Sequence, residues 1–140
     1  MNDLGPIRLF LGVTVIYDRE RGSLTLSQTP FIDELLDLHN LTNARSQDVP
    51  LKSRNFMDSD VPSTALPGYS DQQVLTCAFQ CIIGLLLYLA TWTRPDLSYT
   101  VVALAQCNAS PMQAALLAAK GVLQYLKGMK QWGLTYGEVV

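Results

Sequence analysis

Charged side chains are scarce in this sequence. Only 16% of its 140 residues are Asp, Glu, Lys or Arg, whereas 49% are hydrophobic. Ten basic and twelve acidic residues give a net charge of −2 and a pI near 5.2. A protein that holds nucleic acid through bulk charge has a strongly basic surface. The composition therefore excludes that mode of binding and leaves only local contacts with phosphates.

Histidine and cysteine are also rare. His39 is the single histidine, and Cys77, Cys81 and Cys107 are the three cysteines. Because no second cysteine pair or histidine-rich partner completes a metal-ligand pattern, we predict free, buried thiols in a reducing compartment. His39 falls at a predicted helix end, where a cation is favoured, and has no nucleophile near it in sequence. These residues predict neither a metal site nor a catalytic site.

The longest hydrophobic run is short. It covers ten residues, from Cys81 to Ala90, and Gln80 and Thr91 close it. A bilayer span needs roughly 18 or more such residues, so we predict a buried core helix and no membrane contact. Met1 is followed by Asn and Asp and not by a basic start and an apolar core. A signal peptide is therefore not predicted, and the chain is expected to be intracellular, in the cytoplasm or nucleus, and not secreted.

Alternating hydrophobic residues predict strands in the first part of the chain. Leu9 to Val15 and Ser23 to Ser27 both have period two, and Gly22 in the polar segment between them can take a positive φ. We therefore predict an antiparallel β-hairpin. Thr29 and Pro30 then begin a helix that runs to about Leu38.

The second half of the chain predicts three helices. They cover residues 71–91, which contain the hydrophobic run, 95–108 and 112–127, and Ser70 or Asp71 caps the first. Short joints between them favour an antiparallel bundle. At the joint Arg94-Pro95-Asp96, the proline disfavours helical backbone before it and suits the first turn after it, so we predict a helix–turn–helix corner.

The sequence thus predicts an α+β fold in one domain's length of chain. Its parts are a hairpin and helix (1–42), a loose linker (43–70), a three-helix antiparallel bundle (71–130) and the short first strand of an incomplete sheet (131–140). The linker holds Asp58 and Asp60, which are expected to be solvated because a metal site needs a third ligand.

Several sequence motifs resemble a known family. The passage IIGLLLYLATWTRPDLSYTVVALAQ (82–106), followed by AAKGVLQYLKG (118–128), is similar to the segment between polymerase and RNase H in copia-type retrotransposon polyproteins. NDLGP (2–6), FLG (10–12) and LTLSQ (24–28) resemble the same family's reverse transcriptase just after its catalytic aspartates. The resemblance covers nearly the whole chain, in the family's order.

This resemblance implies the end of the palm, with the thumb and connection helices, of an RNA-directed DNA polymerase. Such a polymerase needs carboxylates that hold two divalent ions, and the family carries them in a Tyr-x-Asp-Asp turn and an earlier aspartate. Asp-Asp occurs nowhere in this sequence. The family's RNase H carboxylates follow the region that Tyr136 matches. We therefore expect a truncated fragment that is not an enzyme, has no catalytic residues and binds no cofactor, although the parent polymerase would use Mg²⁺.

The resemblance also implies weak contacts with an RNA/DNA primer-template. The residues in question are Arg19, Arg21, Gln28, Lys120, Lys127 and Lys130. Where the family's last helix reads Lys-Arg-x-x-x-Arg-Tyr-Leu-Lys-Gly, residues 120–128 lack both arginines, and each loss removes about one phosphate contact. Two alternatives remain, a domesticated protein-interaction module and a weak primer-template-binding remnant. Expected partners are the missing catalytic half of the polyprotein and, through exposed strand edges, further copies of the chain.

Overall fold

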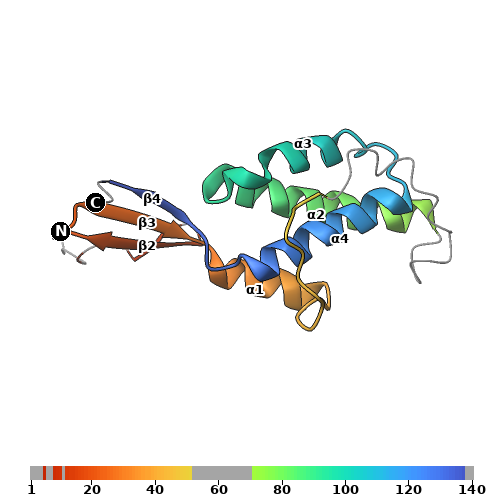
Figure 1. Cartoon of the computed structure of the whole chain (residues 1–140). Coiled ribbons are helices and arrows are strands. Elements are labelled where there is room, and N and C mark those ends of the chain that lie inside the picture. Colours follow the sequence, from red (N-terminus) through yellow and green to blue (C-terminus); the bar gives the residue numbers. More distant parts are fainter. Residues whose placement is uncertain (1–4, 6–7, 11, 52–70, 138–140) are drawn as a thin grey trace.

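The alternating strands of the first part build a sheet that projects from one end of a helical body (Figure 1). The computed structural model describes residues 5, 8–10, 12–51 and 71–137. Linker residues 52–70, with Asp58 and Asp60, lie outside this range. The sheet elements are β1 (Leu9–Phe10), β2 (Val13–Asp18), β3 (Ser23–Ser27) and β4 (Leu134–Tyr136). The helical elements are α1 (Thr29–Leu38), α2 (Gln72–Trp92), the 3₁₀ turn η2 (Pro95–Leu97), α3 (Ser98–Ala105) and α4 (Gln113–Gly128). The α+β prediction is confirmed.

The four strands are antiparallel and lie in the order β1-β2-β3-β4. The predicted hairpin is β2 and β3, and Gly22 takes a φ of 62° in its turn. The prediction of one strand from Leu9 to Val15 was wrong, because the chain turns at Gly12, which takes a φ of 80°, and β1 pairs with β2 antiparallel. β4 pairs with the outer side of β3, with Leu134 opposite Leu26. The expectation that this strand opens a separate sheet was therefore wrong. In the fold, α4 returns the chain to β3, whose free edge satisfies the hydrogen-bonding groups of β4.

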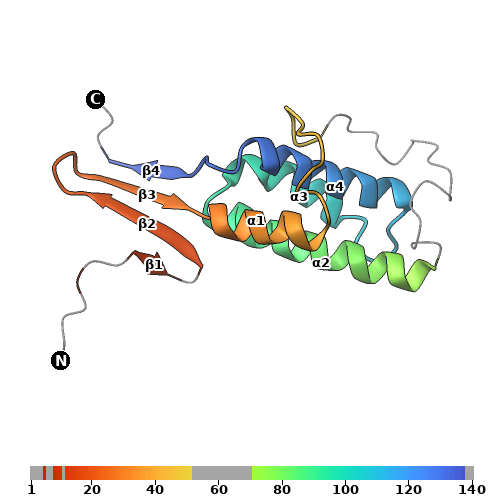
Figure 2. The same cartoon turned by 90° about the horizontal axis from the view of Figure 1, so that it is seen from below.

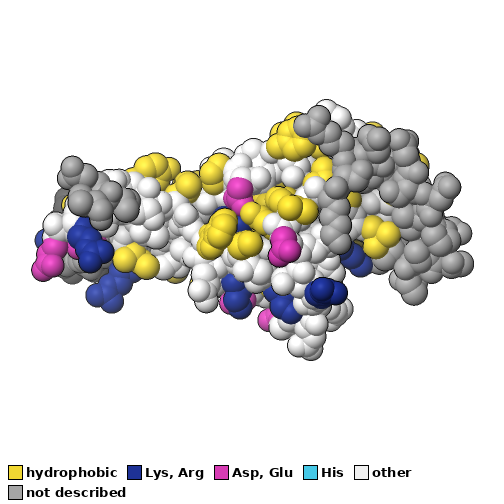
Figure 3. Space-filling model, viewed as in Figure 1, with side chains coloured by type: hydrophobic (Ala, Val, Ile, Leu, Met, Phe, Trp, Pro, Cys, Tyr) yellow, Lys and Arg dark blue, Asp and Glu magenta, His cyan; other side chains and the backbone are white. Residues whose placement is uncertain are grey.

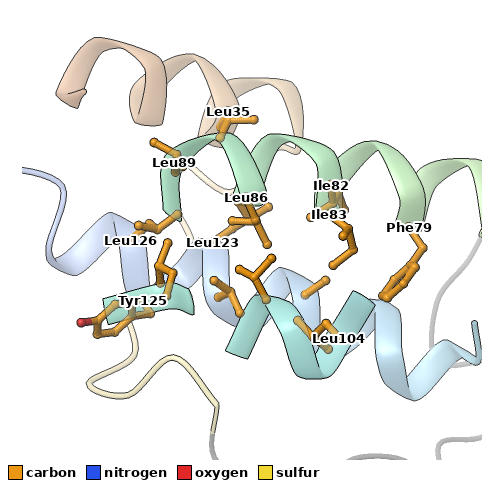
Figure 4. Close-up of a cluster of buried hydrophobic side chains, with 14 of the residues drawn as sticks. Leu35, Phe79, Ile82, Ile83, Leu86, Leu89, Leu104, Leu123, Tyr125 and Leu126 are labelled. Atoms are coloured by element: carbon orange, nitrogen blue, oxygen red, sulfur yellow. The ribbon is translucent and has the colours of Figure 1, made fainter. Parts of the chain in front are cut away.

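The helical body buries the hydrophobic run at its centre (Figure 4). The Asp71 side chain accepts a 2.8 Å hydrogen bond from the backbone N–H of Gln73, so the predicted cap is confirmed. One face of α2 is buried, with Phe79, Leu86 and Leu89 fully covered by neighbouring helices. The predicted core helix is confirmed.

A fourth helix belongs to this body. Ile32, Leu35 and Leu36 of α1 lie in the same hydrophobic cluster as α2, α3 and α4, and Figure 2 shows α1 alongside α2 and α4. The prediction of a three-helix bundle placed α1 with the hairpin instead. The apolar stripe of α1 faces the other helices and is buried in their common core.

The opposite side of α2 is much less covered. The helix has 21 residues and, by length and composition alone, could cross a membrane, although 33% of its apolar window is buried inside the protein. The uninterrupted hydrophobic run of ten residues is thus about half of an apolar helix of 21 residues. Cys77 and Cys81 are exposed on this helix, and Cys107 is half-buried. All three thiols are free as predicted, but the prediction that they are buried was wrong.

Candidate functional site

The corner after α2 is built around a buried charge. Arg94 is 2% exposed, and its Nε and Nη2 donate to Asp96 Oδ1 and Oδ2 at 3.1 and 2.9 Å. Its Nη1 donates to the Met129 carbonyl at 2.7 Å, at the end of α4. The Tyr125 hydroxyl donates to Asp96 Oδ2 at 2.7 Å. Since every group has a partner, the predicted corner is also a clasp that joins α2, η2 and the end of α4.

The ionisation of this clasp follows from its contacts. Burial alone would raise the pKa of Asp96, but hydrogen bonds from Arg94 and Tyr125 and the charge of Arg94 outweigh it and hold that pKa below its usual value. Burial, together with the bond to the Asp96 carboxylate, raises the pKa of Tyr125. At neutral pH the clasp therefore contains an ionised carboxylate and a neutral phenol.

A second set of contacts fastens the sheet to the clasp. Thr93 Oγ1 donates to Gln28 Oε1 at 2.6 Å, and both side chains are buried. Thr29 Oγ1 donates to the Lys130 carbonyl at 2.8 Å. The segment between β3 and α1 is thus bound to the two segments that leave α2 and α4. Gln28, which the resemblance placed among the nucleic-acid contacts, lies inside this junction with 0% exposure.

The predicted basic residues do not form one surface. Arg19 and Arg21 lie at the exposed hairpin tip, where Arg21 is 3.9 Å from the Asp18 carboxylate. At the end of α4, Lys127 donates to the Ala44 carbonyl and Lys130 is 3.0 Å from the Asp33 carboxylate. In Figure 3 the blue side chains stand in small groups beside magenta ones. At each of these two places, a carboxylate of the described part of the chain thus partly neutralises the positive charge.

His39, at the end of α1, and Lys120 of α4 lie close enough for their charges to interact. Burial and the positive charge of Lys120 lower the pKa of His39. The expectation that a cation is favoured at this helix end is therefore corrected, because a second cation stands beside it. The described part of the chain contains no group of three His, Cys, Asp or Glu residues that could hold a metal ion.

Sequence reasoning missed an apolar face on the projecting sheet. The strand register places eight hydrophobic side chains on one face, namely Phe10, Val13, Val15, Tyr17, Leu24, Leu26, Leu134 and Tyr136. We call this set the apolar sheet face. Three aromatic members, Phe10, Tyr17 and Tyr136, are between 51% and 55% exposed. The opposite face carries Thr, Ser and Asp18 together with two exposed hydrophobic residues, Leu9 and Ile16. On it, Thr25 and Thr135 are hydrogen-bonded at 3.2 Å.

The apolar sheet face is separate from the core. The main hydrophobic cluster of the described residues draws its buried members from the helices and η2 and contains no strand residue. Figures 1 and 2 show the sheet extending beyond the ends of the helices in both views. Period two in each strand could have indicated the face, but its full width depends on the pairing of β4 with β3.

The chain is similar to an uncharacterized mitochondrial protein and to retrotransposon Pol polyproteins. It is 34% identical to an uncharacterized mitochondrial protein of Arabidopsis thaliana over 134 residues, which are 96% of this chain and 51% of that protein. It is 27% identical over 137 residues to the retrovirus-related Pol polyprotein from transposon TNT 1-94 of Nicotiana tabacum, covering 98% of this chain and 10% of the polyprotein. For the Pol polyprotein from transposon RE1 of Arabidopsis thaliana, the identity is 33% over 135 residues, or 96% of this chain and 8% of the polyprotein.

The chain thus spans about half, or much less, of the length of these relatives. No protein-family model matches the chain, and no solved structure matches it significantly. The three relatives nevertheless align with almost every residue of the chain. Over nearly its whole length, the chain is therefore homologous to a segment of retrotransposon Pol polyproteins, as its sequence motifs predict.

Proposed function

We propose that the chain is a non-catalytic docking segment of a copia-type reverse transcriptase. In this proposal it comprises the end of the palm with the thumb and connection helices. It has neither polymerase nor RNase H activity of its own, and it acts inside the cell by completing the part of the polyprotein that carries the polymerase carboxylates. The homology to Pol polyproteins and the order of the motifs support this assignment.

The residues present do not fit a two-metal polymerase site. The sequence has no Asp-Asp pair, and the described residues offer no three-ligand group. In the resembled family Mg²⁺ is held by carboxylates upstream of this segment, so the proposal assigns metal binding to the partner polypeptide and not to this chain.

The apolar sheet face is the observation that carries the proposal. Its three aromatic members are more than half exposed, whereas Val13 is buried and the remaining four are half-buried. Large apolar side chains exposed together on one face usually mark an interface. Each square ångström of it that a partner covers contributes about 25 cal/mol. None of the eight side chains carries a charge, so a second apolar sheet can pack on them as in a sandwich.

The partner that fits this face best is another segment of the same polyprotein. In the TNT 1-94 and RE1 polyproteins, the matched segment is 10% and 8% of the chain, so most of the polypeptide lies elsewhere in the same molecule. A covalently linked partner is present at high effective concentration, which favours an intramolecular contact over encounters with other proteins.

Co-purification tests this docking. The full chain is co-expressed with the upstream segment of a homologous Pol polyprotein, the one that carries the Tyr-x-Asp-Asp turn. Tyr17→Lys places a charge on the apolar sheet face, whereas Ile16→Lys, at a neighbouring site of 59% exposure, places it on the opposite face. We expect Tyr17→Lys to abolish co-purification and Ile16→Lys to retain it. Equal retention by both variants would contradict the proposal.

Weak primer-template binding is the second candidate. It is favoured by the hairpin tip, where the Arg21 side chain is 82% exposed. Fluorescence anisotropy with an RNA–DNA hybrid should give a micromolar or weaker dissociation constant at physiological salt, with affinity falling steeply as salt rises. Replacing Arg19 and Arg21 with Ala should weaken binding further and flatten the salt dependence. Nanomolar binding would make this candidate the leading one.

A further inference from the structure

The segment that follows α1 lies across α4 (Figure 1). Residues 44–48, which we call the strap, form neither helix nor strand there. The Gln47 backbone N–H donates to the Gln124 carbonyl at 3.3 Å, and the Gln47 side-chain amide donates to the Gln124 side chain. Lys127 donates to the Ala44 carbonyl. These three hydrogen bonds fix the strap on one face of α4.

Two glycines leave room for the strap on this face. A Cβ at Gly121 would lie 3.3 Å from Gln47 Nε2, and one at Gly128 would lie 3.1 Å from Ser46 Cβ. Glycine is unfavourable inside a helix, but it lets another segment approach the helix backbone closely. At these two residues the strap therefore lies directly on the backbone of α4.

The face under the strap also carries the charge of α4. The helix contains two charged residues, Lys120 and Lys127. At 3.6 residues per turn, their spacing of seven places them two turns apart on the same side of the helix, with Gln124 between them. Lysine and glutamine side chains are common partners of nucleic-acid phosphates and sugars. The face therefore has the chemistry of a contact with a nucleic-acid backbone.

We propose that the strap is an autoinhibitory contact that covers this nucleic-acid-binding face. The inference rests on the second candidate function, weak primer-template binding, and not on docking. With the strap in place, Lys127 is bound to a carbonyl of the same chain, and Gln124 is hydrogen-bonded through both its backbone and its side chain. A nucleic acid must therefore displace the strap before it can use these groups, so the two compete for one face.

A reversible cross-link between the strap and α4 tests the proposal. Ser46→Cys and Gly128→Cys are introduced together into the full chain, with Cys77, Cys81 and Cys107 replaced by Ser. The two Cβ positions are 3.1 Å apart, close to the roughly 3.5–4.5 Å that a disulfide spans. Oxidised glutathione then locks the strap on α4, and a reductant frees it in the same protein.

Fluorescence anisotropy with an RNA–DNA hybrid measures the affinity of both forms. Coupled binding events typically change an affinity by about 5- to 150-fold. We therefore expect the oxidised form to bind the hybrid at least about fivefold more weakly than the reduced form. Circular dichroism checks that both forms are folded.

Two single substitutions in the otherwise unchanged chain give a second test. Gln47→Ala removes a side-chain hydrogen bond between the strap and α4, and the loss of one such bond corresponds to about a 2- to 10-fold change in an equilibrium. We expect this variant to bind the hybrid more tightly by that factor. Thr42→Ala is the control, because Thr42 precedes the strap and donates to Asp37 of α1. It should bind as the wild type does.

Equal affinity of the oxidised and reduced forms would overturn the proposal and leave the second candidate function in place. So would equal affinity of Gln47→Ala and Thr42→Ala, or failure of the two introduced cysteines to cross-link. Absence of binding in every form would overturn the second candidate as well. Docking through the apolar sheet face is tested separately, by co-purification.

Discussion

The guanidinium of Arg94 and the carboxylate of Asp96 meet at two points across Pro95, at 3.1 and 2.9 Å. The guanidinium is buried, and its third bond reaches the Met129 carbonyl at the end of α4. The clasp thus ties the segment that begins α3 to the segment that leads into β4.

Removing the buried partner should be costly. Asp96 keeps 36% of its side chain exposed, so Arg94→Met leaves a carboxylate that water can solvate and a Met129 carbonyl without its donor. We expect a loss of about 1–3 kcal/mol, as for a hydrogen-bonded group that loses its partner. Arg94→Lys should also be destabilised, because an ammonium cannot make the two-point contact. Urea unfolding followed by circular dichroism measures the change. Arg45→Met, at an exposed site, is the control and should stay within about 0.5 kcal/mol of wild type.

Stability should fall in acid because of Asp96. Its pKa is lower in the folded chain than in the unfolded one, so its contribution is fully present above the unfolded value of about 3.9 and is lost as pH falls through the folded value. Asp96→Asn should be less stable than wild type at neutral pH, and the difference should shrink below about pH 4. Unfolding at a series of pH values measures it. A difference that stays constant with pH would contradict the ion-pair account.

The isolated chain should self-associate. The apolar sheet face and the outer edges of β1 and β4 are open to other copies, and 16% charged residues oppose this only weakly. Light scattering coupled to size-exclusion chromatography should show species larger than a monomer, and Tyr17→Lys should reduce them more than Ile16→Lys does. A sharp monomer peak with a cooperative melt would instead favour the domesticated interaction module.

Gly133 lies so close to the backbone of β3 that a larger residue should not fit there. A Cβ there would overlap the Leu26 carbonyl oxygen, so Gly133→Ala should separate the start of β4 from β3 and destabilise the sheet. Gly84 lies in α2 with open space around it, and Gly84→Ala should stabilise the helix by about 0.5–1 kcal/mol. Thermal unfolding of the two variants checks the opposite signs. If both variants changed the melting temperature in the same direction, β4 would not pack against β3 as the structure shows.

Local patterns predicted most of the fold. Period-two alternation indicated β2 and β3, and proline placement indicated the starts of α1 and η2. The pairing of β4 with β3 was missed because it joins residues more than 100 positions apart, and no local signal selects such a partner. Both exposed cysteines were missed because α2 is apolar on all sides, so its composition does not tell which face is buried.

The site was predicted less completely than the fold. The corner at Arg94, Pro95 and Asp96 could be predicted because proline restricts the backbone locally, but its contacts with Tyr125 and Met129 come from a different helix. Gln28 carried no sign of burial, because a glutamine after a strand is usually solvated. Its partner Thr93 lies 65 residues away.

Primer extension tests the central claim most directly. The chain is assayed with Mg²⁺ or Mn²⁺ on a primed RNA template, alone and mixed with the upstream segment of a homologous Pol polyprotein. We predict no extension by the chain alone, and a gain over the upstream segment alone on mixing, which Ile16→Lys retains and Tyr17→Lys abolishes. Extension by this chain alone, in a preparation free of host polymerases, would contradict the account.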